Sequence, residues 1–388
     1  MADGSDPSSE SITVRLVDSL AEVDRDAWDG VANPPGAEWN PFVSWDFLEA
    51  LEASGCVALE TGWAPRHLLV EDGTGALLGA APAYLKGHSR GEFVFDYGWA
   101  DAFERAGGRY YPKLQVAVPF TPVTGPRMLS PTPAVRELLR TGLCEVAAQM
   151  GLSSVHVTFP TGEEWSEAGA EGFLQRMDQQ FIWRNREYQT FDDFLADLAS
   201  RKRKAVRKER AAAAETARIV RLSGDELTPA HWDVFFECYL DTGDRKWGDP
   251  YLNREFFDLL HERMADKIVL VMAYDGDAPI ASALNILGSD ALYGRYWGRL
   301  ADAPFLHFEL CYYQAIEEAI ARGLSRVEAG AQGAHKLARG YAPEPVYSYH
   351  WIAHEGLRDA VAHYLEAERP AVEDEIEALG EHAPFKKG

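Results

Sequence analysis

The sequence predicts a duplicated fold of mixed α/β class, because the two halves of the chain share one order of elements. In the first half, apolar runs at 67–72 and 76–85 flank a turn at Gly73. The same plan recurs at 268–287 around Gly276. Two apolar runs joined by an Asp-Gly turn are typical of a β-hairpin, so each half is expected to contain one.

A helix, a glycine and a strand follow each hairpin. In the first half we expect a helix over 138–150, ended by Gly151, and a strand over 155–159; in the second, a helix over about 306–322, ended by Gly323, and a strand over 326–329. Glycine directly after a helix is typical of a left-handed C-terminal cap. The repeated order predicts a duplicated α/β unit, and the alternative is a chance similarity of two hairpins.

The spacing of these landmarks predicts an insertion in the first half. The hairpin glycines lie 203 residues apart and the helix-ending glycines 172 apart, so the first half holds 31 more residues. We place an inserted ordered loop at about 87–133, a stretch rich in Gly, Pro and aromatic residues. The predicted division is a disordered acidic N-terminus at 1–11, a first domain at 12–185, a second at 186–355 and a C-terminal helical tail at 356–388.

Composition excludes several classes of protein. The formal net charge of −23 argues against DNA or an anionic membrane surface as the main partner. The four cysteines form no zinc-binding spacing and are typical of free thiols in a reducing compartment. No run of about 18 apolar residues and no signal peptide occur, so we expect a cytoplasmic protein without membrane insertion. Its oligomeric state is not predicted.

One short segment opposes this acidic balance. Residues 201–210 hold seven basic side chains and one acid. The apolar spacing of 194–206 predicts that one long helix, carrying this segment, opens the second domain. On it, Arg201, Lys204 and Lys208 share one face, and Arg203, Arg207 and Arg210 share the adjacent one. A solvated helix face is the alternative to an anion-binding ridge, for which the candidates are Arg201, Arg203, Lys204 and Arg207.

Two neighbouring segments of the second half hold candidate catalytic groups. The start of the helix after Pro304 offers backbone amides for a phosphate or an oxyanion. Glu309 is a candidate base there, although an acid in a first turn also complements the helix dipole. A glycine-rich stretch follows, and its candidates are Glu328, Gln332, His335, Lys336, Arg339 and Tyr341. Such groups can orient an amine, accept its proton and hold an anion, whereas the alternative is a solvated connection.

Further binding candidates lie in two other loops. In the insertion, Asp96, Lys113, Gln115 and Arg127 stand among many aromatic residues, which suits either a substrate cleft or a packed loop. Arg245 and Trp247 belong to a similar polar and aromatic connection between helices. The sequence contains no GxSxG, HExxH, P-loop or GxGxxG motif, and metal catalysis is not expected.

Several of these stretches resemble the FemAB-like predicted N-acyltransferases, a peptidoglycan biosynthesis/recognition family of the GNAT superfamily. The resemblance runs from about residue 12 to residue 385 and is carried by Asn40-Pro-Phe with 47–55, by 110–127, 201–210 and 241–248, and by 307–341. It implies an α/β (α+β type) architecture of tandem duplicated GNAT-like folds, with mixed sheets flanked by helices. It also implies transfer of an acyl or aminoacyl group to an amine.

The resemblance implies a polyanionic donor. In the related Fem ligases the donor is an aminoacyl-tRNA, and in ordinary GNAT enzymes it is acyl-CoA. The usual CoA pyrophosphate loop, (Gln/Arg)-x-x-Gly-x-(Gly/Ala), does not precede the 306–322 helix, because 298–304 occupies its place. This departure weighs against simple acetyl-CoA use and does not by itself establish tRNA use.

The sequence therefore predicts an N-acyltransferase that uses an activated donor, a small amine acceptor and no metal. Glu328, His335 and Glu309 are the candidates for base or proton relay, and Tyr341 is the candidate acid. Lys336 and Arg339 are expected to hold an anionic group of donor or acceptor. The alternatives are an aminoacyl-tRNA-dependent transferase acting on a cell-wall precursor or peptide, and a non-catalytic protein that binds RNA or an amino sugar.

Overall fold

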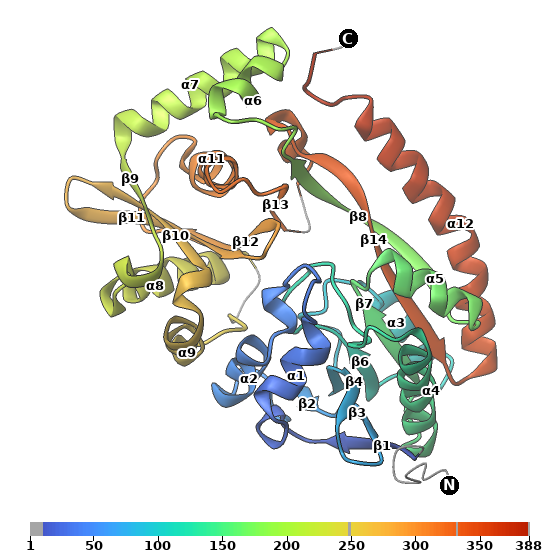
Figure 1. The fold of residues 1–388 in the computed structure, drawn as a ribbon. Helices are drawn as coiled ribbons and strands as arrows, with labels where there is room; N and C mark the ends of the chain where they lie inside the picture. Colours follow the sequence, from blue (N-terminus) through green and yellow to red (C-terminus); the bar gives the residue numbers. More distant parts are fainter. Residues whose placement is uncertain (1–10, 247–249, 331–332, 387–388) are drawn as a thin grey trace, which may run out of the picture. The chain divides into compact units, whose positions relative to one another are not determined.

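The computed structural model describes residues 11–246, 250–330 and 333–386 of the chain. The chain divides into two compact units (Figure 1). Unit 1 comprises Met1–Asp178 and Val346–Ala371, and unit 2 comprises Gln179–Pro345 and Val372–Gly388. Both units combine strands with helices, so the predicted α/β class is confirmed.

Unit 1 contains two groups of strands. Its elements in chain order are β1 (Ile12–Val17), α1 (Arg25–Ala32), α2 (Trp45–Ala53), β2 (Trp63–Pro65), β3 (His67–Asp72), β4 (Leu77–Ala81), β5 (Ala83–Lys86), α3 (Tyr97–Arg105), β6 (Lys113–Val116), α4 (Pro133–Gln149), β7 (Ser154–Thr158) and α5 (Gly162–Ala170). One sheet has the order β1-β3-β4, and the strands β2-β5-β6-β7 follow one another in the second. The predicted insertion thus holds a helix, α3, and a strand, β6.

The first predicted hairpin is confirmed by the antiparallel pairing of β3 with β4. The residue of its turn that adopts a left-handed conformation is Gly75, with φ 85°, and not Gly73. The Asp72 carboxylate closes the turn by accepting hydrogen bonds from the backbone N–H groups of Thr74 and Ala76. The predicted helix and its end are confirmed too, because α4 is followed by Gly151 at φ 64°.

Helix α4 covers an apolar face of the unit 1 sheet. The buried side chains in this core include Leu114, Val116, Leu139, Leu143, Val155 and Val157. Strands β6 and β7 are parallel, and α4 forms the crossover between them. The helix therefore shields one side of these strands from solvent.

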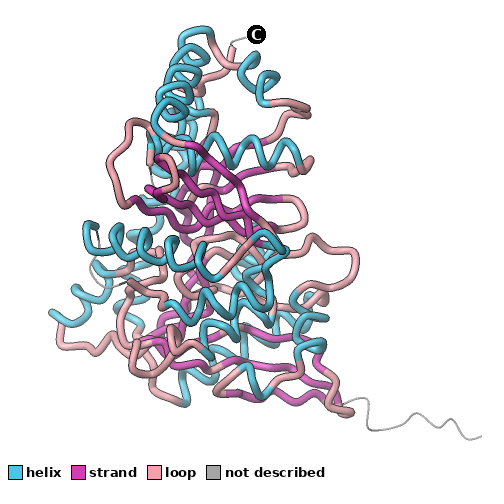
Figure 2. The backbone as a smooth tube through the Cα atoms, turned by 90° about the vertical axis from the view of Figure 1, so that its left-hand side faces the viewer, coloured by secondary structure: helices cyan, strands magenta, loops and turns pink. Residues whose placement is uncertain are grey.

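Unit 2 contains a run of parallel and antiparallel strands with helices on both faces. Its elements are the end of β8 (Leu174–Arg184), α6 (Phe191–Asp197), α7 (Ser200–Thr216), β9 (Arg218–Leu222), α8 (Pro229–Lys246), α9 (Arg254–Met264), β10 (Ile268–Asp275), β11 (Ala278–Leu287), β12 (Ala291–Arg299), α10 (Leu306–Phe308), a π-helical turn (Glu309–Tyr313), α11 (Gln314–Ala321), β13 (Arg326–Glu328) and the start of β14 (Ala342–Ile352). The strand order is β8-β13-β12-β11-β10-β9. Helix α11 lies on one face of the sheet and α8 on the other, so the strands pass between helices (Figures 1 and 2).

The second copy of the predicted plan is present in unit 2. Strands β10 and β11 pair as an antiparallel hairpin, with Gly276 at φ 59° in the turn. The helix predicted over 306–322 consists of α10, the π-helical turn and α11 in succession, and Gly323 at φ 68° follows it. The duplication inferred from sequence is therefore visible as two similar orders of strands and helices.

The prediction of one long helix at the start of the second half is wrong. Helices α6 and α7 are separated at Leu198 and Ala199, whose backbones are extended. The Ala199 N–H donates to the Pro384 carbonyl at 2.9 Å, and the Lys386 N–H donates to the Asp197 carbonyl at 3.0 Å. The chain breaks from helical geometry here because its backbone pairs with the C-terminal segment.

The segment Val346–Ala371 belongs to unit 1, although the predicted limits assign it to the second domain and the tail. Residues Ser348–Ile352 of β14 pair antiparallel with β7 and so add a strand to the unit 1 sheet. Helix α12 (Glu355–Gly380) follows, and Leu357, Val361 and Leu365 pack with Trp99 and Tyr110 of unit 1. The precise domain limits remain a prediction.

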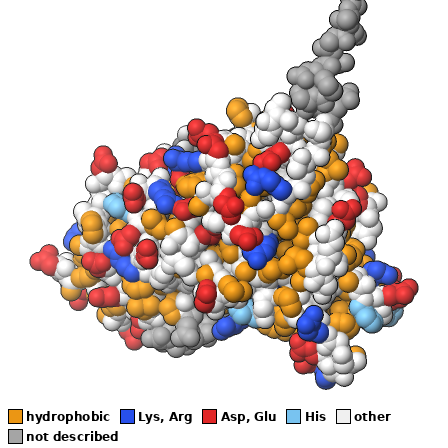
Figure 3. All heavy atoms as spheres, turned by 90° about the horizontal axis from the view of Figure 1, so that it is seen from below, with side chains coloured by type: hydrophobic (Ala, Val, Ile, Leu, Met, Phe, Trp, Pro, Cys, Tyr) orange, Lys and Arg blue, Asp and Glu red, His pale blue; other side chains and the backbone are white. Residues whose placement is uncertain are grey.

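Acidic side chains are spread over the surface. On the face seen in Figure 3, Asp and Glu side chains are scattered among hydrophobic and basic ones, in keeping with the net charge of −23. Within the described residues, no helix combines the length and the apolar character that crossing a membrane requires.

Candidate functional site

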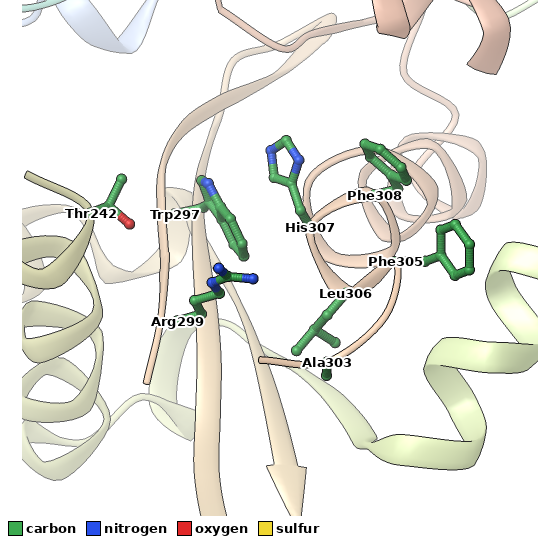
Figure 4. A pocket seen from close by; sticks show the side chains of 8 residues that line it. All are labelled: Thr242, Trp297, Arg299, Ala303, Phe305, Leu306, His307 and Phe308. Atoms are coloured by element: carbon green, nitrogen blue, oxygen red, sulfur yellow. The ribbon is translucent and has the colours of Figure 1, made fainter. Parts of the chain in front are cut away.

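A cavity of about 440 Å³ lies within unit 2, between the end of β12 and the start of α10 (Figure 4). It is lined by Thr242, Trp297, Arg299, Ala303, Phe305, Leu306, His307 and Phe308. Aromatic rings make up much of the wall, and Arg299 and His307 supply polar groups. Such a combination is typical of a small-molecule site.

Strand and helix geometry direct these side chains into the cavity. Trp297 and Arg299 are two residues apart on β12, so they project to one face of the strand. Phe305 has a left-handed φ of 59° and marks the turn from which α10 begins. The His307 ring then lies against the Trp297 ring with centroids 4.4 Å apart.

His335 lies next to this cavity. The 3₁₀ helix Ala334–Arg339 places its ring 6.0 Å from the His307 ring, centroid to centroid. Its Nε2 is 2.8 Å from the hydroxyl of Tyr312, which belongs to the π-helical turn. Burial raises the pKa of Tyr312, so the phenol stays neutral near neutral pH, and its oxygen can accept a hydrogen bond from the Nε2–H of His335, which places the lone pair of the neutral ring on Nδ1. A histidine held in this way is suited to accept a proton from a substrate.

Arg339 joins the same cluster through a ring contact and an ion pair. Its guanidinium lies 3.4 Å from the centroid of the Phe308 ring, and Phe308 lines the cavity. The same group pairs with Glu209 of α7 at 2.9 Å and donates to the His335 carbonyl at 2.8 Å. Arg339 therefore connects the basic helix α7 to the segment that carries His335.

Lys336 and Tyr341 complete the cluster from its buried side. The Lys336 ammonium donates to the Gly330 carbonyl at 2.7 Å, and burial lowers its pKa to about 8. The Tyr341 ring lies 5.5 Å from that of Tyr312, and its hydroxyl finds no hydrogen-bond partner among the described residues. The Lys336 ammonium and the Tyr341 hydroxyl are thus two buried groups that can donate a hydrogen bond close to the aromatic rings of the site.

The two predicted glutamate bases are held in ion pairs. Glu309 is buried, pairs with Arg210 of α7 at 3.0 Å and accepts from Gln314 at 2.7 Å. Glu328 pairs with Arg326 at 2.9 Å, although burial raises its pKa. The structure thus gathers His335, Lys336, Arg339 and Tyr341 together, whereas Glu309 and Glu328 each have a cationic partner.

The basic residues of α7 divide into an outer and an inner group. Arg201, Lys204 and Arg207 are exposed, and Arg203 is half-buried. Arg207 is also 3.4 Å from the exposed carboxylate of Asp192. Arg210 instead points inward to its glutamate partners. An outward cationic face therefore remains on the helix that packs against the π-helical turn and the 3₁₀ helix.

The candidates from the insertion are buried inside unit 1. Lys113 pairs with Glu92 and Asp96, and Gln115 donates to Thr158 at 3.1 Å. The Arg127 guanidinium donates to backbone carbonyls alone, those of Val123, Gly125, Pro126 and Thr158. All four candidates thus have protein partners, and ligand binding by them remains a prediction.

The side chains of three other predicted site residues are not among those that the structure describes. Trp247 and Gln332 lie outside the described residues, and of Arg245 only its place in α8 is described. Sequence reasoning missed Trp297, Phe308 and Tyr312 as parts of the site. The available signal was the crowding of aromatic residues on both sides of one strand-to-helix connection, at 293–297 and 305–313.

Solved structures share this architecture over most of the chain. FemX superposes with a TM-score of 0.55 at 11% identity, covering 91% of this chain and 100% of FemX. The C-terminal domain of a candidate lysylphosphatidylglycerol synthetase from Agrobacterium fabrum gives a TM-score of 0.54 at 10% identity, with coverages of 91% and 98%. L-PGS from Bacillus licheniformis gives 0.50 at 10% identity, with coverages of 85% and 98%. At these identities the likeness concerns the fold.

Unit 2 thus presents a polar cluster beside an aromatic cavity, and unit 1 repeats its plan of strands and helices. No match was found among curated proteins. Residues 19–387 match the FemAB-like family, described as peptidoglycan biosynthesis/recognition. The chain belongs to this family, and the resemblance inferred from its motifs is confirmed.

Proposed function

We propose that unit 2 transfers an aminoacyl group from an aminoacyl-tRNA to the amine of a peptidoglycan precursor in the cytoplasm. The observation that favours tRNA as the donor is the exposed basic face of α7, because it concentrates positive charge on a chain whose net charge is −23. Arg201, Lys204 and Arg207 follow one another at intervals of three residues, so they span the two adjacent basic faces on the exposed side of the helix. A line of cations suits the repeated phosphates of a nucleic acid strand.

The connection between β12 and α10 supports the same donor. A CoA pyrophosphate loop uses glycines that let backbone amides approach the phosphates. Here the corresponding residues include Asp302, which is paired with Arg299 at 2.5 Å, and Pro304. The aromatic wall of the cavity provides stacking surfaces of the kind that unpaired nucleic acid bases occupy.

The reaction makes modest demands on this chain. The acceptor nitrogen forms an amide bond with the ester carbonyl carbon, the ester C–O bond breaks, and the amine proton ends on the released hydroxyl. His335 is suited to accept that proton, with Tyr312 orienting its ring. Lys336 is mostly protonated below pH 8 and can donate a hydrogen bond to the oxyanion or to an anionic substrate group.

Binding of a purified aminoacyl-tRNA, measured at several salt concentrations, tests the donor. We expect the triple variant Arg201→Gln, Lys204→Gln, Arg207→Gln to bind at least about tenfold more weakly, with a shallower salt dependence because three phosphate contacts are lost. The control is Arg105→Gln, which removes an exposed arginine paired with Asp101 on α3 of unit 1.

Thermal shifts measured with a panel of acyl-CoAs test the alternative donor. Stabilisation by an acyl-CoA, together with tRNA binding that the triple variant leaves unchanged, would reject tRNA as the donor. Mass spectrometry of amine acceptors incubated with either donor then distinguishes a transferase from a protein that only binds its ligand.

A further inference from the structure

One face of the unit 1 sheet is polar and yet buried. Tyr84, Gln115, His156 and His350 are register partners across β5, β6, β7 and β14. Trp63, Lys86 and Lys113 form a second row, two residues further along the strands and hence on the same face. Each of these seven side chains has at most 1% of its surface exposed. A buried sheet face usually carries apolar side chains, as the opposite face does under α4.

Lys86 and Lys113 lie directly opposite each other on antiparallel strands. Like charges in this position oppose folding, and buried ammonium groups need anionic partners. The partners come from residues 88–96, which we call the covering segment. A Glu92 carboxylate oxygen lies 2.7 Å from the Lys113 Nζ, and its other oxygen lies 3.8 Å from the Lys86 Nζ. Asp96 also bonds Lys113.

Glu92 does not hold both lysines in their charged form. Burial lowers the pKa of Lys86 to about 6 and raises that of Glu92 to about 7, so the two groups tend to neutralise each other by proton exchange. A phosphate dianion would hold on one group the two negative charges that Glu92 and Asp96 now supply separately, of which Asp96 is paired with Lys113.

Several polar atoms of this sheet face and of the covering segment lack hydrogen-bond partners among the described residues. They are Trp63 Nε1, Tyr84 OH, Glu92 Oε1, Asp96 Oδ1 and Gln115 Oε1. Each buried polar atom left unpaired costs about 1–3 kcal/mol, and native cores hold few of them. The centroid of the Trp63 ring lies 3.5 Å from the Lys86 Nζ, so its indole N–H is a donor beside the lysines for an anion with more oxygens than a carboxylate has.

The lysines and the carboxylates differ in how firmly they are held. Lys86 and Lys113 belong to hydrogen-bonded strands, whereas Glu92 and Asp96 belong to an irregular connection. Phe93, next to Glu92, has a strained φ of 59°. Displacing the carboxylates therefore requires rearrangement of the covering segment and loss of the hydrogen bond that Asp96 accepts from Tyr110, while the strands keep their pairing.

We infer that Lys86 and Lys113 form a binding site for a phosphate group, either free phosphate or a phosphate ester. The carboxylates of Glu92 and Asp96 occupy this site while the covering segment is closed. The site lies wholly in unit 1, so it goes beyond the transfer reaction proposed for unit 2 and does not depend on it.

Thermal unfolding in inorganic phosphate, with chloride at matched ionic strength as reference, tests the inference. Glu92→Gln keeps the shape of the side chain and removes its charge, so it should lower Tm in chloride and regain about 2–4 °C in phosphate. Glu92→Gln combined with Lys113→Met should not respond to phosphate. Glu163→Gln, which alters an exposed carboxylate paired with Arg136, is the control and should not respond either.

Hydrogen exchange on the unchanged protein provides a second measurement. Phosphate should speed the exchange of amides at 88–96 by displacing the carboxylates, while amides of β5 and β6 stay protected. Glycerol 3-phosphate in place of phosphate shows whether an ester also fits, and a response to either compound supports the site. Unchanged exchange at 88–96 with both compounds would overturn it, as would an equal Tm shift in all variants.

Discussion

Lys336 differs from the other lysines and arginines of the candidate site because its amine is buried and has a lowered pKa of about 8. Its one hydrogen bond in the described structure is to the Gly330 carbonyl. A lysine in this state is able to change charge within the pH range in which an enzyme works, whereas Arg339 nearby keeps its charge throughout.

Replacing Lys336 should therefore alter the pH dependence of transfer. If the ammonium form is required, the rate of the unchanged enzyme falls as pH rises through about 8. Lys336→Arg keeps its charge at that pH, so the alkaline fall should move upward, while Lys336→Met should lose most activity at every pH. Initial rates over a pH series measure this. An alkaline fall at the same pH in the arginine variant would contradict the role.

The stability of the protein should report the same pKa. The unfolded chain binds a proton at Lys336 up to about pH 10.5 and the folded chain only up to about pH 8. The unfolded state thus holds more protons between these values, and this residue's contribution to the free energy of unfolding rises with pH there. Denaturant unfolding at pH 8 and pH 10 should show a smaller rise for Lys336→Met than for the unchanged protein. Equal rises would place the Lys336 pKa elsewhere.

Part of this site was predictable from sequence because its residues stand close together along the chain. His335, Lys336, Arg339 and Tyr341 fall in one stretch whose glycines and charged groups indicate a functional loop. The partner of Glu309 was not predictable, because Arg210 lies 99 residues away. Phe308 and Tyr312 have helical spacing, which by itself indicates core packing as readily as a site.

At the scale of elements, the separation of α6 from α7 depends on the end of the chain. Thr190 and Asp193 form a capping box that starts α6, a local signal that the sequence contains. The helix end at Leu198 has no comparable local signal, because the extended backbone there pairs with residues 384–386. The hairpins were predictable for the opposite reason, since their strands and turns are neighbours in sequence.

Deleting residues 381–388 should loosen the start of α7. The deletion removes backbone hydrogen bonds at Asp197 and Ala199, together with the Phe385 ring that lies 3.8 Å from the Arg186 guanidinium. We expect a loss of about 1–3 kcal/mol in the free energy of unfolding. Trypsin should also cleave faster at Arg201–Arg203. A chain ending at Lys386 keeps these contacts and is the control. Equal cleavage rates would show that α6 and α7 separate without help from the C-terminus.

At the scale of the whole molecule, the order of the chain and the composition of the compact units do not coincide. Unit 1 takes its last strand and part of its core from Val346–Ala371, after the whole of the unit 2 sheet has been formed in sequence. The sequence repeat indicates that the fold is duplicated. It does not indicate that Val346–Ala371 returns to unit 1, because that depends on the pairing of β14 with β7, which lie far apart in the sequence. Nothing in the local pattern of β14 indicates which half of the chain it joins.

A fragment of residues 1–185 should therefore fail to fold although it spans a whole predicted domain. Without residues 346–371, β7 loses its partner strand and the apolar surfaces of Trp99 and Tyr110 lose the covering helix α12. Adding residues 343–371 as a separate chain should restore a cooperative thermal transition, which circular dichroism would detect. A shuffled peptide of the same composition is the control, since it retains hydrophobicity without the strand register. If the fragment alone unfolds cooperatively near the Tm of the full chain, the segment is an accessory to unit 1, and the predicted limit near residue 185 marks an independently folding domain.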